Sequence, residues 1–216
     1  MSNEIKGLLI KDLMLLKNQR QFFGIAVFIF LAMLFFYDNM QFCIAYVTMM
    51  FAFFTLSTMS YDEHDNGMGY LFSLPVTRRA YVREKYVLCF ILSFASCMGI
   101  SILSYIIGLV RKTIESSMEF WLYSIVIVLM ACVLLAIQFP LQAKFGIEKS
   151  RIMLVATVGI ISAGIYFGME LVDFTILNMI NNQSIAIIVA VLLAAAVVIV
   201  CISYKITVRI VEKKEF

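Results

Sequence analysis

Long apolar runs separated by clusters of charge are the feature that most restricts how this 216-residue chain can fold. The six runs are residues 22–37, 40–60, 86–110, 120–140, 152–169 and 184–204. A helix needs about 20 apolar residues to cross roughly 30 Å of hydrocarbon. Four runs reach that length, whereas the first is short and the fifth is marginal. The sequence therefore predicts an all-α polytopic membrane protein with six transmembrane helices in one domain, residues 1–216.

The composition excludes the soluble alternatives. Hydrophobic residues make up 63% of the chain and charged residues only 14%, against roughly 45–50% and about 25% in soluble domains. A single core of this size cannot hide so much apolar surface, and a disordered chain does not have this composition.

The basic residues predict the orientation. Of the 17 Lys and Arg residues, 15 fall in residues 1–21, in the second and fourth connections, and in the tail, residues 205–216. Because basic residues gather on the cytoplasmic side of a membrane, both termini are predicted to be cytoplasmic, in a multi-pass protein of the plasma membrane. Cytoplasmic termini require an even number of spans, which agrees with six.

Residues 1–21 are predicted to form a short helix in the membrane interface. Its apolar stripe consists of Ile5, Leu9, Leu13 and Leu16. Asp12 interrupts this stripe.

The spans offer no chemistry of their own. Every charged residue lies between the predicted spans or at their edges, which argues against an ion relay. The only histidine, His64, lies in a connection, and no GxxxxGK[ST] phosphate loop is present.

The stretch 62–65 fits a solvated loop that caps a helix better than a metal site. Five cysteines, an odd number, lie inside the runs, which argues against disulfides and zinc. We predict no catalytic residue, metal site, cofactor or nucleic-acid partner for this chain.

The connection at residues 61–85 is the most informative segment. Asp65 or Asn66 can cap a short helix of about two turns, which Pro75 ends, and Thr77 suits the N-cap of the third span. This helix is apolar although it lies outside the membrane, at Tyr70, Leu71, Phe72 and Leu74. Two interpretations remain open: a knob that enters a partner's groove, or a segment that lies back on the lipid headgroups.

Six spans, cytoplasmic termini and the motif DNG…YLFSLPVTRR within residues 61–86 resemble type-2 ABC transporter permeases. The likeness is greatest to the small permeases of Gram-positive bacteria that export phenol-soluble modulins and related amphipathic peptides. The resemblance implies that this short helix is the coupling helix, which docks into a separately encoded ATPase. The implied docking residues are Asn66, Gly67, Met68, Gly69, Tyr70, Leu71, Phe72, Ser73, Leu74 and Pro75. Two ATPase copies, which bind ATP and Mg, and a second permease copy or a paralogue are implied as partners.

The fourth connection, Gln142–Ser150, is basic, and Gly146 allows a tight turn in it. A second ATPase contact there would use Lys144, Phe145, Gly146, Glu148 and Lys149. The sequence favours the alternative, a plain solvated loop.

Small residues recur at helical spacing in the fifth run, namely Gly159, Ala163, Gly164 and Gly168. Such spacing lets two helices approach closely in lipid, either between two protomers or within one. The connection that follows, residues 170–183, is acidic and predicts an external or a re-entrant helix.

Ten of the 19 phenylalanines lie between Phe22 and Phe54, and hydroxyl side chains punctuate the second span. Soft apolar walls with a few hydroxyls suit amphipathic cargo, although plain lipid contact is the alternative for any one phenylalanine. The candidate cargo path comprises Phe28, Phe35, Thr48, Met49, Phe53 and Thr55. The function predicted is therefore the permease subunit of an ATP-driven exporter of amphipathic peptides. The alternative is a membrane scaffold or immunity protein that binds such peptides without turnover.

Overall fold

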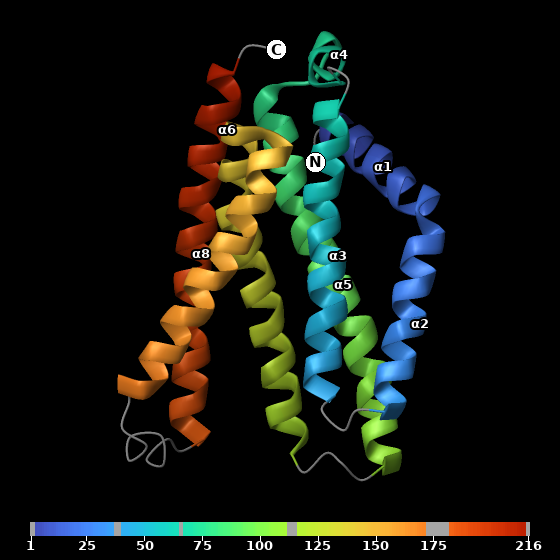
Figure 1. Ribbon diagram of the computed structural model, residues 1–216, viewed down its shortest axis with the longest axis vertical. Helices are drawn as coiled ribbons and strands as arrows, with labels where there is room; N and C mark the ends of the chain where they lie inside the picture. Colours follow the sequence, from blue (N-terminus) through green and yellow to red (C-terminus); the bar gives the residue numbers. More distant parts are fainter. Residues whose placement is uncertain (1–2, 37–39, 65–66, 112–115, 172–181, 215–216) are drawn as a thin grey trace.

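The computed structural model describes residues 3–36, 40–64, 67–111, 116–171 and 182–214. These residues form seven helices and no strand, which confirms the all-α class. The helices are α1 (Asn3–Asn18), α2 (Arg20–Phe36), α3 (Met40–Glu63), α4 (Gly67–Ser73), α5 (Arg78–Arg111), α6 (Ser117–Leu171) and α8 (Asn182–Lys213). Figure 1 shows an elongated bundle with α4 at one end, where α1 begins and α8 finishes. We call this the α4 end.

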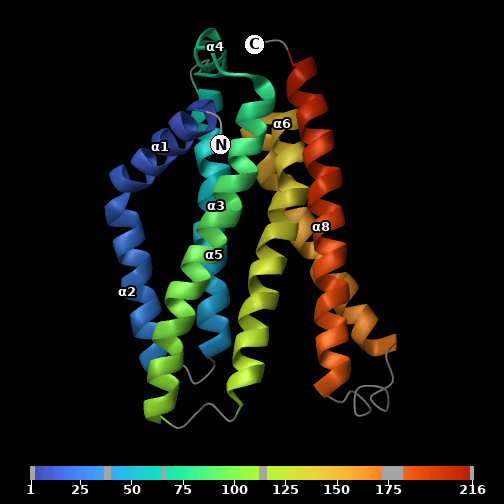
Figure 2. The same ribbon diagram turned by 180° about the vertical axis from the view of Figure 1, so that it is seen from behind.

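Four of the described helices are long and apolar enough to cross a membrane. They are α3, α5, α6 and α8, and the apolar part of α2, Arg20–Leu34, is shorter. In Figure 2, α5 runs the length of the bundle between α2 and the first part of α6. The apolar runs of the sequence thus fall on the helices of the bundle.

The long helix α6 is a hairpin rather than one rod. Gly146 has φ 76° and ψ −178°, and the helical segments before and after it run in opposite directions (Figure 1). We call residues 117–145 the first arm and residues 147–171 the second arm. The loop predicted over Gln142–Ser150 is therefore wrong, because helix continues to both sides of one glycine. Glycine allows the turn since this backbone region is essentially closed to other residues.

The interfacial stripe predicted for residues 1–21 differs from the face that α1 buries. Ile5, Leu8 and Leu9 are buried together with Asp12, which is fully enclosed, whereas Leu13 is 47% exposed. The buried positions follow the helical spacing of three and four residues, and Asp12 belongs to them. An aspartate lies on this face because a lysine pairs with it there, as described below.

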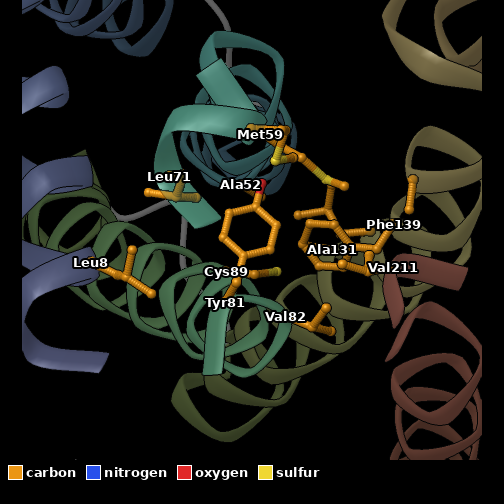
Figure 3. Packing of buried hydrophobic residues seen from close by; sticks show 13 residues of the cluster. Leu8, Ala52, Met59, Leu71, Tyr81, Val82, Cys89, Ala131, Phe139 and Val211 are labelled. Atoms are coloured by element: carbon orange, nitrogen blue, oxygen red, sulfur yellow. The ribbon is translucent and has the colours of Figure 1, made fainter. Parts of the chain in front are cut away.

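Three groups of buried apolar side chains hold the bundle together. The largest lies toward the α4 end and joins α1, α3, α4, α5, α8 and the first arm of α6. Figure 3 shows members of this group from several helices, with the ring of Tyr81 seen between Leu71 of α4 and Phe139 of the first arm. None of the three groups contains a residue of the second arm. The α4 end is thus the most extensively connected part of the described chain.

Candidate functional site

The short helix α4 has two different faces. Met68 and Leu71 are buried in the largest apolar group. Tyr70 and Leu74 point away from it, with 74% and 43% of their surface exposed. The predicted apolar knob is therefore wrong for Leu71, which anchors the helix instead of facing outward. Seven residues are too few for periodicity to separate the two faces from sequence alone.

The start of α4 depends on a close approach that only glycine allows. A Cβ atom at Gly67 would lie 2.8 Å from the carbonyl oxygen of Asp62 at the end of α3. The ring of Phe72 meets the ring of Tyr81 edge to face, with centroids 5.8 Å apart. These contacts fix α4 against both α3 and α5. Asn66, also predicted as a docking residue, lies outside the described residues.

The turn after α4 is tied to both ends of the chain. Thr77 caps α5 as predicted: its hydroxyl oxygen accepts a hydrogen bond from the Ala80 N–H at 3.2 Å. The same hydroxyl donates to Glu4 of α1 at 3.2 Å. Arg78 donates to the carbonyl oxygens of Val211, Glu212 and Lys214. A movement of α4 would therefore be transmitted through these hydrogen bonds to α1, α5 and α8.

A buried cluster of charges connects α1, α3 and α5. The Nζ atom of Lys85 lies 2.5 Å from Asp12 Oδ2 and 2.9 Å from Asp62 Oδ2, and it donates to Thr58 Oγ1 at 3.1 Å. Lys11 adds a second ammonium, which pairs with Asp62 and lies 3.2 Å from Asp12. The side chains of Lys85, Asp12 and Asp62 are 2%, 0% and 9% exposed. This pairing could not be predicted from the sequence, because its partners lie far apart along the chain.

The solvated loop predicted for residues 62–65 is wrong for the two residues that close α3. Asp62 belongs to the buried cluster, and Glu63 pairs with Lys214 near the end of α8 at 3.2 Å. Asp65 lies outside the described residues. Among the residues that the structure describes, no group of three or more His, Cys, Asp or Glu side chains is arranged to hold a metal ion.

Glu84 adds a third carboxylate to the buried cluster. It is fully enclosed, and its nearest ammonium is that of Lys85, 3.7 Å away. Its two carboxyl oxygens accept no hydrogen bond from any described residue. Because buried carboxylates are costly without a positive partner, the enclosed ammonium of Lys85 is placed to stabilise carboxyl groups from three helices, and Lys11 assists it at Asp12 and Asp62.

A cavity of about 700 Å³ lies between α3 and the two arms of α6. Its apolar lining comes from Phe53, Leu56, Ile147 and Leu154. Its polar lining includes Ser57, Ser60, Tyr61, Gln138, Gln142 and Arg151. It extends from the turn at Gly146 down along α3 for about three helical turns. Such a mixed lining matches a molecule with one apolar face and one polar face.

Two glutamines organise the wall of this cavity. Gln142 donates to the carbonyl oxygen of Leu56 at 3.1 Å and to Ser60 Oγ at 3.0 Å, which joins the first arm to α3. Gln138 donates to Thr157 Oγ1 at 2.5 Å and joins the two arms. Neither glutamine was predicted as a functional residue from the sequence. Their spacing of four positions at the end of an apolar run was the available signal, since it puts two amides on one helix face.

Among the described side chains of the candidate cargo path, Phe53 is the one that lines this cavity. Thr48 and Thr55 are fully buried in α3, and Met49 packs against the largest apolar group. Phe28 is 72% exposed on α2, and the side chain of Phe35 lies outside the described part of the chain. The six residues thus do not form one continuous surface among the described side chains.

The comparison with known families decides what kind of protein this is. Residues 7–212 match the family described as ABC-2 family transporter protein. The chain belongs to the ABC-2 transporter family. Membership supports a permease subunit of an ABC transporter that works with an ABC ATPase, and with the apolar helices it indicates a multi-pass membrane protein. No curated protein and no solved structure matches the chain significantly.

The turn of this ABC-2 protein between the two arms lies at the α4 end. Lys144, Glu148 and Lys149 are exposed there, and Phe145 is 38% exposed. The Nζ atom of Lys144 lies 5.1 Å from the centroid of the Phe145 ring. The second predicted set of ATPase contacts therefore lies at an exposed, tight turn between two helical arms rather than in a loop.

The small residues of the second arm face open space in a single copy of this ABC-2 protein. Gly159, Ala163 and Gly164 are exposed. A Cβ atom at Gly159 or Gly164 would meet no atom within 4 Å. These two glycines therefore do not serve helix packing within the described chain. The surroundings of Gly168 and nearly all of residues 170–183 lie outside the described residues.

Proposed function

We propose that this chain is the permease subunit of an ATP-driven exporter with six membrane crossings and cytoplasmic termini. The proposal counts α2 and each arm of α6 as a crossing beside α3, α5 and α8. The 17 residues of α2 extend about 26 Å, close to the roughly 30 Å of a hydrocarbon core. Supporting the orientation, 15 of the 17 basic residues lie in the segments assigned to the cytoplasm.

The two-faced helix α4 is the observation that carries the proposal. Its outer face offers the exposed side chain of Tyr70, and Leu74, directly after the helix, is exposed too, while Leu71 is enclosed by the bundle. A partner that binds the outer face would move a helix already packed on α3 and α5. In this account α4 is the coupling helix, and the exposed turn at residues 144–149 is a second contact with the same ATPase.

The cargo proposed is an amphipathic peptide. The mixed lining of the cavity between α3 and the arms of α6 supports this class of cargo, with Phe53 and Leu154 for apolar side chains and Gln142 for polar groups. Two copies of the permease, or one copy and a paralogue, would meet along the small-residue face of the second arm. The ATPase, in two copies, would bind ATP and Mg and drive alternating access.

Co-purification with the partner ABC ATPase tests the docking assignment. We expect wild-type permease to retain the ATPase and the Tyr70→Ala/Leu74→Ser variant to lose most of it. Tyr123→Ala is the matched control, because Tyr123 is also exposed, at 51%, but lies near the start of α6, away from the α4 end. Equal retention by wild type and the double variant would contradict the assignment. Peptide binding without any ATP turnover in the complex would favour the scaffold or immunity protein.

A further inference from the structure

A second hollow lies outside the proposed cargo cavity. It is a groove of about 980 Å³ between the first arm of α6 and the C-terminal half of α8. Figure 2 shows these two segments side by side toward the α4 end. The groove shares no lining residue with the cavity beside α3. It is therefore a separate candidate binding site.

The walls of the groove are apolar and directed away from the bundle core. Ile199, Ile202 and Ile206 of α8 are 39%, 53% and 44% exposed. Ala136 and Ala143 of the first arm are buried and form its floor with small side chains. Both helices are long and apolar enough to cross a membrane. Hydrocarbon chains of the bilayer are the natural filling for such a surface.

Among the described residues, the charged side chains at the α4 end of the groove are all positive. They are three lysines, Lys144, Lys213 and Lys214, and no acidic residue of the described chain lines the groove. Lys214 is engaged by Glu63 and by the carbonyl oxygen of Ala143, both at 3.2 Å. Lys144 and Lys213 are exposed, and neither forms an ion pair or hydrogen bond with any described residue. Two ammonium groups with no anionic partner among the described residues thus lie where an apolar groove meets water, and that of Lys144 contacts only the face of the Phe145 ring.

We propose that this groove binds one anionic glycerophospholipid, with an acyl chain along α8 and the headgroup phosphate at Lys144 and Lys213. The charge complementarity carries the choice of occupant: a zwitterionic lipid would fill the apolar part equally well but would gain less from two uncompensated cations. Basic pockets between membrane helices on the cytoplasmic side favour anionic headgroups for this reason. Lys144 also belongs to the turn proposed to contact the ATPase, so the lipid site is tested on the permease alone.

Native mass spectrometry of the full-length protein tests this site. The protein in detergent is titrated with phosphatidylglycerol and phosphatidylcholine that carry identical acyl chains. We expect wild type to prefer phosphatidylglycerol and Lys144→Gln/Lys213→Gln to lose about tenfold or more of that preference. The Lys144→Arg/Lys213→Arg variant should keep it. Lys205→Gln/Arg209→Gln, which removes two exposed charges of α8 outside the groove, is the matched control.

A second pair of variants tests the apolar part. Ile206→Trp fills the groove, whereas Val198→Trp places the same ring at an exposed position of α8 outside its lining. We expect fewer lipids retained by the first variant alone. An unchanged phosphatidylglycerol preference in Lys144→Gln/Lys213→Gln would overturn the proposal. An equal loss in Lys205→Gln/Arg209→Gln would also overturn it, because the effect would then reflect surface charge in general.

Discussion

Helix α3 and the second arm of α6 are both apolar helical segments, yet the chain covers them very differently. Ten of the 24 residues of α3 are buried. In the second arm, Ser150 is the one buried residue among those whose side chains are described. The helix α3 packs against α5 and the first arm, whereas most of the second arm faces outward.

The difference separates the part of the molecule that is fully packed within one copy from the part that leaves its surface exposed. The polar residues of α3 near the α4 end, Thr58 and Asp62, bind Lys85 inside the bundle. The polar Thr157 of the second arm binds Gln138 beside the cavity, and a Cβ atom at Gly159 or Gly164 of the same arm would meet no atom within 4 Å. Substitutions around α3 should therefore alter folding, and substitutions on the second arm should alter assembly.

Removal of Lys85 should have the largest effect. Lys85→Met leaves the carboxylates of Asp12 and Asp62 in a buried site with less compensation, and such a change costs about 3–5 kcal/mol. Thermal unfolding in detergent, followed by circular dichroism, should show a large fall in Tm. Lys205→Met on the exposed side of α8 should not. Adding Asp12→Asn should restore part of the loss, and equal Tm values for the two lysine variants would break the comparison.

The two faces of α4 should separate folding from docking. Leu71→Ala removes a buried anchor and should lower the free energy of unfolding by about 2–3 kcal/mol. Tyr70→Ala removes an exposed ring and should leave Tm close to that of wild type while weakening ATPase binding. Both quantities can be measured on the same purified samples. A Tm loss for Tyr70→Ala as great as for Leu71→Ala would contradict the assignment of the faces.

Two glycines of α6 should respond in opposite ways to alanine. Gly146→Ala places a side chain at φ 76° and should cost about 1–3 kcal/mol. Gly159→Ala lies in a helix with open space around it and should be neutral or stabilising by up to about 1 kcal/mol. Tm values of both variants provide the check. Similar losses for the two would show that the second arm is packed more closely than described.

The smallest effect on folding is expected on the second arm itself. Gly164→Leu should not destabilise a single copy and could stabilise it by up to about 1 kcal/mol, since the position is open and leucine favours a helix more than glycine does. If this face joins two permease copies, the same variant should reduce the cross-linked dimer in membranes. Ile152→Leu, at an exposed position of the same arm, is the control. A dimer yield equal to that of the control would remove the face from the proposed interface.

Local signals in the sequence predicted part of this structure well. Pro75 and Thr77 act within a few residues of themselves, so the short helix and the start of α5 could be predicted from them. The apolar runs similarly predicted helices, because helix length in lipid depends on composition. The sequence predicted an interruption near Gly146. It predicted a loop of several residues, whereas the structure turns at one glycine.

Long-range contacts explain what the sequence could not show. Lys85 and Asp12 are 73 positions apart, and neither residue alone indicates that the other is its partner. Leu71 and Tyr70 are both large and partly apolar, and only the packing of α4 on the bundle separates anchor from exposed face. The cavity exists because the turn at Gly146 brings Arg151 of the second arm opposite α3, and the sequence does not show this reversal of direction.

The most direct test of the account is the ATPase rate of the complex in proteoliposomes, titrated with an amphipathic helical peptide. The account predicts that peptide changes the rate with wild-type permease and that Tyr70→Ala/Leu74→Ser removes this response while the isolated ATPase keeps its basal rate. The claim that α4 couples this permease to ATP hydrolysis would be contradicted if no such peptide changed the ATPase rate. It would also be contradicted if the peptide still changed the rate with the double variant.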